Sequence, residues 1–129
     1  MTACPCQSGD SYASCCAPFH DGGSAPTALQ LMRSRYAAFI KRDAAYLFRT
    51  CHTSLRAGYD PRGLRDSFAL AWCGLEIVGL HAGGPEDPQG MVHFRAHWRA
   101  ATGDLQFHEE RSRFVRDRDG AWVYRDAKG

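Results

Sequence analysis

The segment that decides how the start of this chain folds is residues 4–16, CPCQSGDSYASCC. It holds four of the chain's six cysteines and contains no apolar run that could form a core of its own. Four thiolates on one metal ion would supply the missing stability, because the free energy of metal binding then becomes free energy of folding. We therefore expect Cys4, Cys6, Cys15 and Cys16 to bind one ion.

The ligand type and number favour a structural Zn²⁺ ion. Four sulfurs complete the tetrahedral shell of a structural zinc site and leave no position for a catalytic water. Pro5 fixes the turn inside the first cysteine pair, and Gly9 permits the reversal that brings back the second pair. Two alternatives stay open. His20 replaces Cys16 as a ligand if Cys16 points away, or iron replaces zinc in the four-cysteine site.

This segment resembles the SEC-C motif, the zinc knuckle also found at the C-terminus of the SecA translocation ATPase. The resemblance covers CPC at 4–6, the Ser-Gly pair at 8–9, Tyr12, and the cysteine pair at 15–16. In that motif three cysteines and a histidine or fourth cysteine hold zinc, which implies the same four cysteines here. Gln7 stands where the motif usually has glycine.

Length and composition suit one ordinary domain with a small appendage. The chain has 129 residues, of which 44% are hydrophobic and 23% charged, and these values are typical of a globular protein. No apolar run approaches the roughly 18 residues of a membrane span. The first residues lack the features of a signal peptide, so we expect a cytoplasmic protein, in which clustered thiols favour metal over disulfides. Cys51 and Cys73, which are isolated, are expected to be buried free thiols.

The formal charge of +2 would be cancelled by four thiolates binding one Zn²⁺, so it gives little support for a nucleic-acid partner. Six arginines could still form a basic stripe on neighbouring strands: Arg95, Arg99, Arg111, Arg113, Arg116 and Arg118. Glu109, Glu110, Asp117 and Asp119 interrupt that stripe, which favours a solvated sheet face.

The rest of the chain predicts an α+β domain. A Gly/Ser-rich linker, residues 21–26, places a boundary between a zinc knuckle at 1–22 and a second domain at 23–129. We expect helices from Pro26 or Thr27 to about Ile40, at 44–50 and at 61–70, with irregular chain at 52–56. Strands are expected at 73–81, 91–99, 105–116 and 121–125. Along 91–99 the residues alternate, with one face made of Val92, Phe94, Ala96 and Trp98 and the other of His93, Arg95, His97 and Arg99. Helices followed by an antiparallel meander indicate an α+β fold.

The first long helix carries one predicted buried stripe: Leu29, Met32, Arg33, Tyr36, Phe39 and Ile40. An arginine on such a stripe needs an anionic or carbonyl partner. Arg35 falls off the stripe and is expected to be a solvated or rim residue.

The third predicted strand, residues 105–116, offers an anionic partner for Arg33. If Phe114 faces the interior, then Glu110 and Ser112 do too, and Glu110 would pair with Arg33. The predicted ligand-binding set is Arg33, Tyr36, His108, Glu110 and Ser112. A functional interpretation adds His93 or His97 as a proton-transfer group. The favoured alternative is an internal ion pair with exposed histidines.

Three tracts resemble the YchJ-like family of bacterial proteins: LMRSRY at 31–36, TCHTSLR at 50–56, and residues 110–114 together with 122–124. These proteins pair a SEC-C knuckle with a domain similar to nuclear transport factor two. The resemblance implies helices cupped by a strongly curved antiparallel sheet, which form a cone with a pocket. Cys51 stands where relatives tend to have tryptophan. The family carries no reaction that could be assigned here.

Two functions are therefore expected. In the first, the protein is a zinc-binding adaptor whose knuckle presents Gln7, Asp10 and Tyr12 to a protein partner, while the cone supplies a second contact or a small-ligand pocket. In the alternative, the protein is a small enzyme of the isomerase, dehydratase or hydrolase type that uses the polar groups of the cone.

Overall fold

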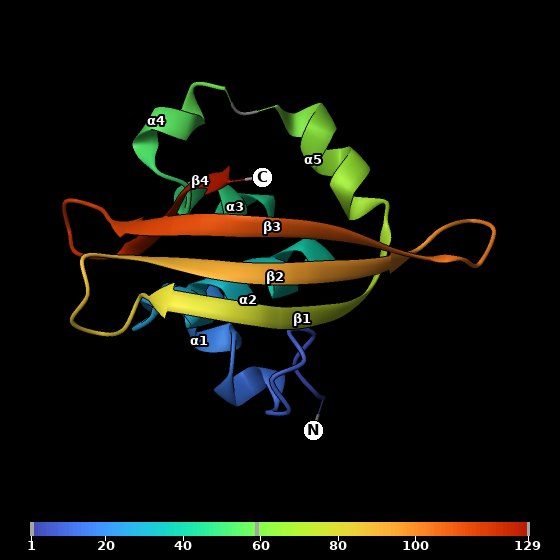
Figure 1. Ribbon diagram of the computed structural model, residues 1–129, viewed down its shortest axis with the longest axis horizontal. Helices are drawn as coiled ribbons and strands as arrows, with labels where there is room; N and C mark the ends of the chain where they lie inside the picture. Colours follow the sequence, from blue (N-terminus) through green and yellow to red (C-terminus); the bar gives the residue numbers. More distant parts are fainter. Residues whose placement is uncertain (1, 59, 129) are drawn as a thin grey trace.

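The computed structural model describes residues 2–58 and 60–128, and it shows helices packed on one face of a four-stranded antiparallel sheet (Figure 1). The strands lie in chain order: β1 (Ala71–Ala82), β2 (Gln89–Arg99), β3 (Leu105–Arg116) and β4 (Trp122–Lys128). The helices between the N-terminal segment and the sheet are α2 (Ala28–Lys41), α3 (Ala44–Arg49), α4 (Thr53–Arg56) and α5 (Pro61–Phe68). The predicted α+β fold of a curved sheet with packed helices is confirmed.

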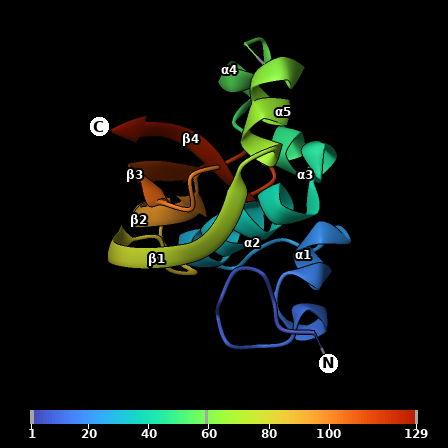
Figure 2. The same cartoon turned by 90° about the vertical axis from the view of Figure 1, so that its right-hand side faces the viewer.

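The N-terminal segment lies beside α2, below the edge formed by β1 (Figures 1 and 2). It contains a 3₁₀-helix, η1 (Tyr12–Ser14), and one turn of α-helix, α1 (Ala17–His20). Neither element was expected from the sequence.

Side-chain caps fix the starts of the helices. The Thr27 side chain accepts the Gln30 N–H at the start of α2, and the Asp43 side chain accepts the Tyr46 N–H at the start of α3. The expectation of irregular chain at 52–56 is wrong, because His52 caps the short helix α4 by accepting the Ser54 N–H.

Two features of β1 curve the sheet over α2. Its pairing with β2 shifts register between Trp72 and Gly74 and again between Ile77 and Gly79, and such bulges bend a strand. At the β1–β2 turn, a Cβ on Gly90 would lie 2.4 Å from the Gly83 Cα, so this close approach requires glycine. The Gly83 carbonyl accepts the Ala28 N–H at 2.9 Å, which ties this turn to the start of α2.

The core lies between the sheet and α2. Along β2, the side chains of Val92, Phe94 and Ala96 are buried, whereas those of His93 and Arg95 point to the outer face. The predicted alternation of this strand is therefore confirmed. On β3, the buried Phe114 and Ser112 face the same interior, as expected.

Helix α2 is buried over more than one stripe. Ser34, Arg35, Ala37 and Ala38 are buried, whereas Ile40 is 36% exposed. The prediction of a single stripe is wrong because the helix packs against the N-terminal segment, α3 and the sheet, and so buries several sides at once.

The isolated cysteines also differ from expectation. Cys73 is exposed and Cys51 is half-buried. Cys73 lies on the edge strand β1, beside the bulge at Gly74, where the alternation of inward and outward residues is interrupted. In the described parts of the chain, no helix has both the length and the apolar character needed to span a membrane.

Candidate metal centre and ligand cavity

The four N-terminal cysteines converge on one point. The Sγ atoms of Cys4, Cys6, Cys15 and Cys16 all lie within 4.8 Å of one another. The Cys6–Cys15 distance is 3.5 Å and the Cys15–Cys16 distance is 3.8 Å. Sulfurs about 2.3 Å from a tetrahedral zinc ion are about 3.8 Å apart, so this set fits a four-sulfur metal shell. All of these cysteines are free thiols rather than disulfides.

Local backbone contacts shape the cluster. The Cys4 N–H donates to the Asp10 carbonyl at 2.9 Å, which closes the loop between the two cysteine pairs. Gln7, with φ of 64°, makes the left-handed turn after the first pair. Cys16 precedes α1 as its N-cap residue and is buried together with Cys4 and Cys6, whereas Cys15 is half-buried. The shell is thus largely closed to solvent.

Burial and hydrogen bonds among the thiols shift their pKa values in opposite directions. The hydrogen bond from Cys16 lowers the pKa of Cys6 to about 4. The same bond raises the pKa of Cys16, while burial raises the pKa of Cys4 to about 11. One thiolate is therefore held by neighbouring thiols, an arrangement in which a cation could replace the shared protons.

His20 does not join the cluster. Its Nε2 donates to the Ser34 carbonyl at 2.8 Å, so in the neutral ring Nδ1 accepts from the Tyr12 hydroxyl at 2.6 Å. Its ring also packs edge-on against Tyr46, with the centroids 4.7 Å apart. Because both nitrogens are engaged, His20 joins the N-terminal segment to α2 instead of replacing Cys16 as a ligand.

Arg33 also holds the N-terminal segment in place. Its Nη1 donates to the Cys6 carbonyl at 2.9 Å. It therefore lies on the metal side of α2, outside the cavity described below, and the predicted Arg33–Glu110 pair does not form. The inference that an arginine here needs a carbonyl or anionic partner is correct, but the partner is the backbone beside a candidate metal ligand.

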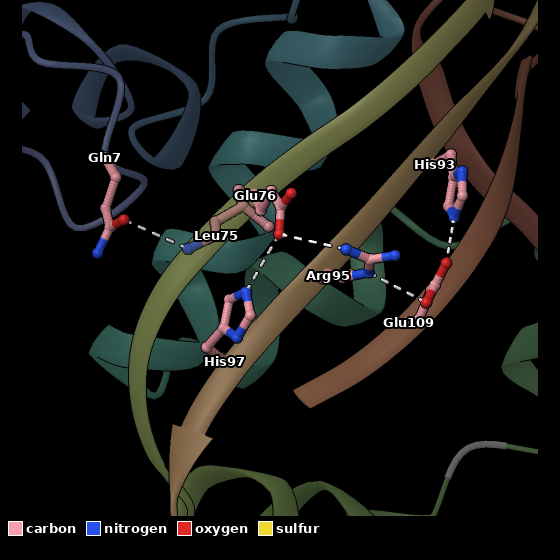
Figure 3. Close-up of polar contacts among 7 residues, drawn as sticks. All are labelled: Gln7, Leu75, Glu76, His93, Arg95, His97 and Glu109. Carbon is pink, nitrogen blue, oxygen red and sulfur yellow. Dashed lines mark hydrogen bonds and ion pairs between the residues drawn. The ribbon is translucent and has the colours of Figure 1, made fainter. Parts of the chain in front are cut away.

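Gln7 attaches the same segment to the sheet. Its side chain donates to the Cys73 carbonyl at 3.0 Å and accepts the Leu75 N–H at 3.4 Å (Figure 3). Tyr12 is likewise used within the molecule, since the Lys41 Nζ lies 4.0 Å from its ring centroid. Of the three residues expected to contact a partner, only Asp10 remains exposed without a side-chain role of this kind.

A cavity of about 560 Å³ lies on the other side of α2, between the helix and the inner face of the sheet. Its walls are mainly aromatic and apolar, and its polar groups come from α2, α5, β3 and β4. The lining residues are Met32, Arg35, Tyr36, Phe39, Ser67, Leu70, Trp72, Phe94, Ala96, Trp98, Phe107, His108, Glu110, Ser112 and Tyr124. The cavity thus contains four of the five predicted ligand-binding residues, all except Arg33.

Glu110 is the centre of the polar groups on the sheet. One carboxylate oxygen accepts from the Ser112 hydroxyl and from the Tyr124 hydroxyl, the latter at 3.4 Å. The other lies 3.3 Å from the His108 Nε2. Burial, followed by the nearby Glu110 charge, raises the pKa of Tyr124 to about 12, so the phenol stays protonated and remains a donor.

Arg35 was missed by the single-stripe interpretation. It is 9% exposed, and its Nη1 donates to the Leu47 carbonyl at 3.0 Å and to the Thr50 Oγ1 at 2.6 Å. Its guanidinium carbon lies 5.0 Å from the Tyr124 ring centroid. The spacing of Leu31, Arg35 and Ala38 at i, i+4 and i+7 was the available signal for a second buried stripe.

Tyr36 provides an unusual group in the cavity wall. Its side chain is 3% exposed, and its hydroxyl has no hydrogen-bond partner among the described residues. Burial raises the pKa of Tyr36 to about 12, which keeps this hydroxyl protonated. The nearby backbone of Gly74 lowers that pKa slightly but does not form a hydrogen bond with the hydroxyl. Buried polar groups normally find a partner.

The outer face of the sheet carries mixed charges. Glu109 accepts from Arg95 at 3.1 Å and pairs with His93 at 2.6 Å, while Glu76 lies 3.4 Å from His97 (Figure 3). Both histidines therefore lie outside the cavity, so neither can serve as its predicted proton-transfer group. The alternation of acids and bases also supports a solvated face over a basic stripe.

Comparison with known proteins matches both parts of the chain. A family model described as "YchJ, middle NTF2-like domain" matches residues 27–127, and a model of the SEC-C motif matches residues 2–18. The protein thus combines a SEC-C motif with a domain similar to nuclear transport factor two. The chain belongs to the YchJ-like family, whose relatives include proteins called UPF0225.

Relatives of similar length are found in several bacteria. A UPF0225 protein of Streptomyces avermitilis is 47% identical over 130 residues, spanning 98% of this chain and 84% of its own. The solution structure of a SEC-C motif containing protein from Rhodopseudomonas palustris is 33% identical, has a TM-score of 0.86, and covers 98% of this chain and 97% of its own. The crystal structure of a SEC-C motif containing protein from Psychrobacter arcticus is 30% identical and has a TM-score of 0.83. It covers 95% of this chain and 80% of its own.

Proposed function

We propose that this protein is a zinc-stabilised small-molecule-binding protein. Cys4, Cys6, Cys15 and Cys16 would hold one structural Zn²⁺ ion, and the cavity between α2 and the sheet would bind the small molecule. The observation that carries the proposal is that α2 serves both sites. Arg33 on this helix holds the Cys6 carbonyl, whereas Arg35 and Tyr36 line the cavity.

The donor set supports zinc as the ion. The four sulfurs are close to tetrahedral spacing and three of them are buried, so a bound ion would keep no open position for substrate. Zinc would replace the apolar core that the segment lacks, and would keep it seated on α2 and β1.

The cavity supports ligand binding because of its size and lining. Its volume lies within the usual range for small-molecule sites, and it combines aromatic walls with a few converging polar groups. The partner-binding role expected for the knuckle receives less support, because Gln7 and Tyr12 contact the protein's own helices and sheet.

Metal analysis and NMR test the two parts of the proposal separately. Purified protein should contain one zinc per chain, and Cys4→Ser/Cys6→Ser protein should contain none; iron in place of zinc would contradict the assignment. A mixture of small fragments of mixed charge should shift the amide signals of Tyr36, Trp72 and Ser112. Shifts confined to outer-face residues such as Arg95, or no shifts, would contradict the cavity as a site.

One observation favours an enzyme as the second candidate function. His108 and Glu110 lie 3.3 Å apart at the cavity wall, and such a pair can relay a proton. If the cavity performs acid–base chemistry, a ligand that copurifies with His108→Gln protein should be the substrate, and wild-type protein should convert it. Failure of the wild type to change that ligand would leave binding as the function.

A further inference from the structure

Arg35 is a buried cation without a carboxylate partner. Its side chain is 91% shielded, and among residues 2–58 and 60–128 no carboxylate oxygen lies within 4.0 Å of its guanidinium. Placing a charge in such surroundings is costly unless it is paired. The contacts of Nη1 with Leu47 and Thr50 satisfy one of the three guanidinium nitrogens.

Glu110 does not neutralise this charge. Its two oxygens are already engaged by Ser112, Tyr124 and His108, and Tyr124 lies between the two charged groups. Arg35 contacts the ring of Tyr124, whereas Glu110 contacts its hydroxyl. The cavity therefore has a cationic end with unused N–H donors and, separately, an anionic wall whose hydrogen-bonding capacity is largely filled.

The aromatic ring of Tyr36 lines the same cavity, while its hydroxyl is buried away from the cavity, near the backbone of Gly74 on β1. Its hydroxyl is buried and unpartnered, although buried hydroxyls normally form hydrogen bonds. The neighbouring walls are aromatic, with the rings of Tyr36 and Trp72 6.4 Å apart and steeply inclined to each other. A ligand that completed this site would carry a negative charge for Arg35 and a flat apolar body for the walls.

We propose that the cavity binds a small aromatic monocarboxylate, with its carboxylate on Arg35 and its ring against Trp72 and Phe94. This assignment rests on the proposed small-molecule function and specifies the ligand class. The fixed negative charge of Glu110 disfavours a second charge on the ligand, so a phosphate monoester, which carries nearly two charges at neutral pH, binds less tightly than a carboxylate.

A matched ligand series tests the charge preference in metal-loaded, full-length protein. The probes are 1-naphthylacetate, 1-naphthylacetamide, 1-naphthylmethylamine and 1-naphthyl phosphate, titrated by calorimetry and by amide NMR. The acid should bind at least about tenfold more tightly than the amide, because hydrogen bonds to a charged group contribute about 1.5–3 kcal/mol. The amine should bind most weakly, and the phosphate should fall below the acid.

Each outcome of the series has a distinct meaning. Equal binding of acid and amide, or preference for the amine, overturns the carboxylate assignment while small-molecule binding stands. Preference for the phosphate assigns the site to phosphate monoesters and overturns the monocarboxylate. If none of the four probes binds and the fragment mixture also leaves the cavity signals unchanged, the proposed function itself fails.

Variants separate the anchor from the rest of the protein. Arg35→Met should abolish the preference of the acid over the amide, because that preference depends on hydrogen bonds between two charged groups. The matched control is Arg111→Met, which removes an exposed arginine from β3. It should leave the affinity unchanged. If Arg35→Met does not fold, the Arg35 Nε–H NMR signal of the wild-type protein decides the test. That signal should shift when the acid is added, and an unchanged signal at saturating acid overturns the proposal.

Discussion

On the metal side of α2, the polar side chains described above find partners within the protein. Arg33 meets a carbonyl, both nitrogens of His20 are engaged, and the Tyr46 hydroxyl lies 2.6 Å from the Ser34 Oγ. On the cavity side, Arg35 keeps unused N–H groups and the buried Tyr36 hydroxyl has no partner. The same helix thus has one side whose polar groups are satisfied by its own chain and one side whose polar groups are not.

The largest expected effect comes from removing a candidate metal ligand on the metal side. Cys6→Ser should lower zinc affinity by more than about 100-fold, since losing a residue that merely supports a ligand costs about 10–100-fold. Amide signals of residues 2–22 should collapse, because that segment has no apolar core. Those of β2 and β3 should persist if the predicted boundary at residue 22 is correct. Signals of Ala37 and Leu75 should shift, because both lie at contacts with this segment.

Cys73→Ser is the control for that experiment, because Cys73 is exposed and lies outside the cluster. It should retain full zinc content and an unchanged spectrum. Collapse of the β2 and β3 signals in Cys6→Ser would show that the two parts fold as one unit, and would contradict the division at residue 22.

An alkaline titration examines the cavity side. The folded pKa of Tyr36 is about 12, against about 10 in the unfolded chain. The unfolded state therefore ionises first, so this contribution to stability is complete below pH 10 and is lost as the pH rises toward 12. The loss should be about 2 kcal/mol. Urea unfolding at several pH values should show a decline that is smaller by this amount in Tyr36→Phe, and parallel declines would refute the assignment.

A matched pair of hydroxyl deletions compares the two sides at neutral pH. Tyr46→Phe removes a hydroxyl that is hydrogen-bonded to Ser34 and should lower the free energy of unfolding by about 1 kcal/mol. Tyr36→Phe removes a buried hydroxyl without a partner and should raise it by up to about 1 kcal/mol. Urea denaturation of ligand-free, metal-loaded protein measures both changes. Equal losses in the two variants would mean that the two sides do not differ in this way.

The comparison also shows which features are readable from sequence. The cysteine cluster could be predicted because its chemistry is local, with both pairs and the gap between them contained in thirteen residues. The inner faces of β2 and β3 followed from alternation. The roles of Arg33 and Arg35 were exchanged because periodicity identifies stripes on a helix but not their neighbours. Residues 2–22 pack on the side of α2 that carries Arg33, so Arg33 supports the metal site and does not line the cavity. The hydrogen bond from Arg33 to the Cys6 carbonyl joins residues 27 positions apart, which periodicity cannot predict.

The same limit applies to the cavity. The positions of Glu110, Ser112 and Tyr36 were predictable from element patterns, but the partners of Glu110 were not. Tyr124 reaches it from β4 through a register shift opposite Arg113 and Phe114, and a shift of this kind has no counterpart in the alternation of the sequence. The unpartnered state of the Tyr36 hydroxyl likewise depends on the packing of several elements around it.

The smallest expected effect concerns the join between the metal side and the sheet edge. Gln7 has a left-handed backbone, which costs a residue other than glycine about 1–2 kcal/mol, and its side chain makes two hydrogen bonds to β1. Gln7→Gly removes both the backbone strain and the two side-chain hydrogen bonds, so it should change the free energy of unfolding little. Gln7→Ala keeps the backbone strain but loses the hydrogen bonds, so it should lower the free energy of unfolding by about 1 kcal/mol. In both variants the Leu75 amide should exchange faster with solvent. If Gln7→Gly and Gln7→Ala were equally stable, backbone strain at this position would be negligible. The hydrogen bonds of the Gln7 side chain to β1 would then not offset any strain caused by the absence of glycine at this position.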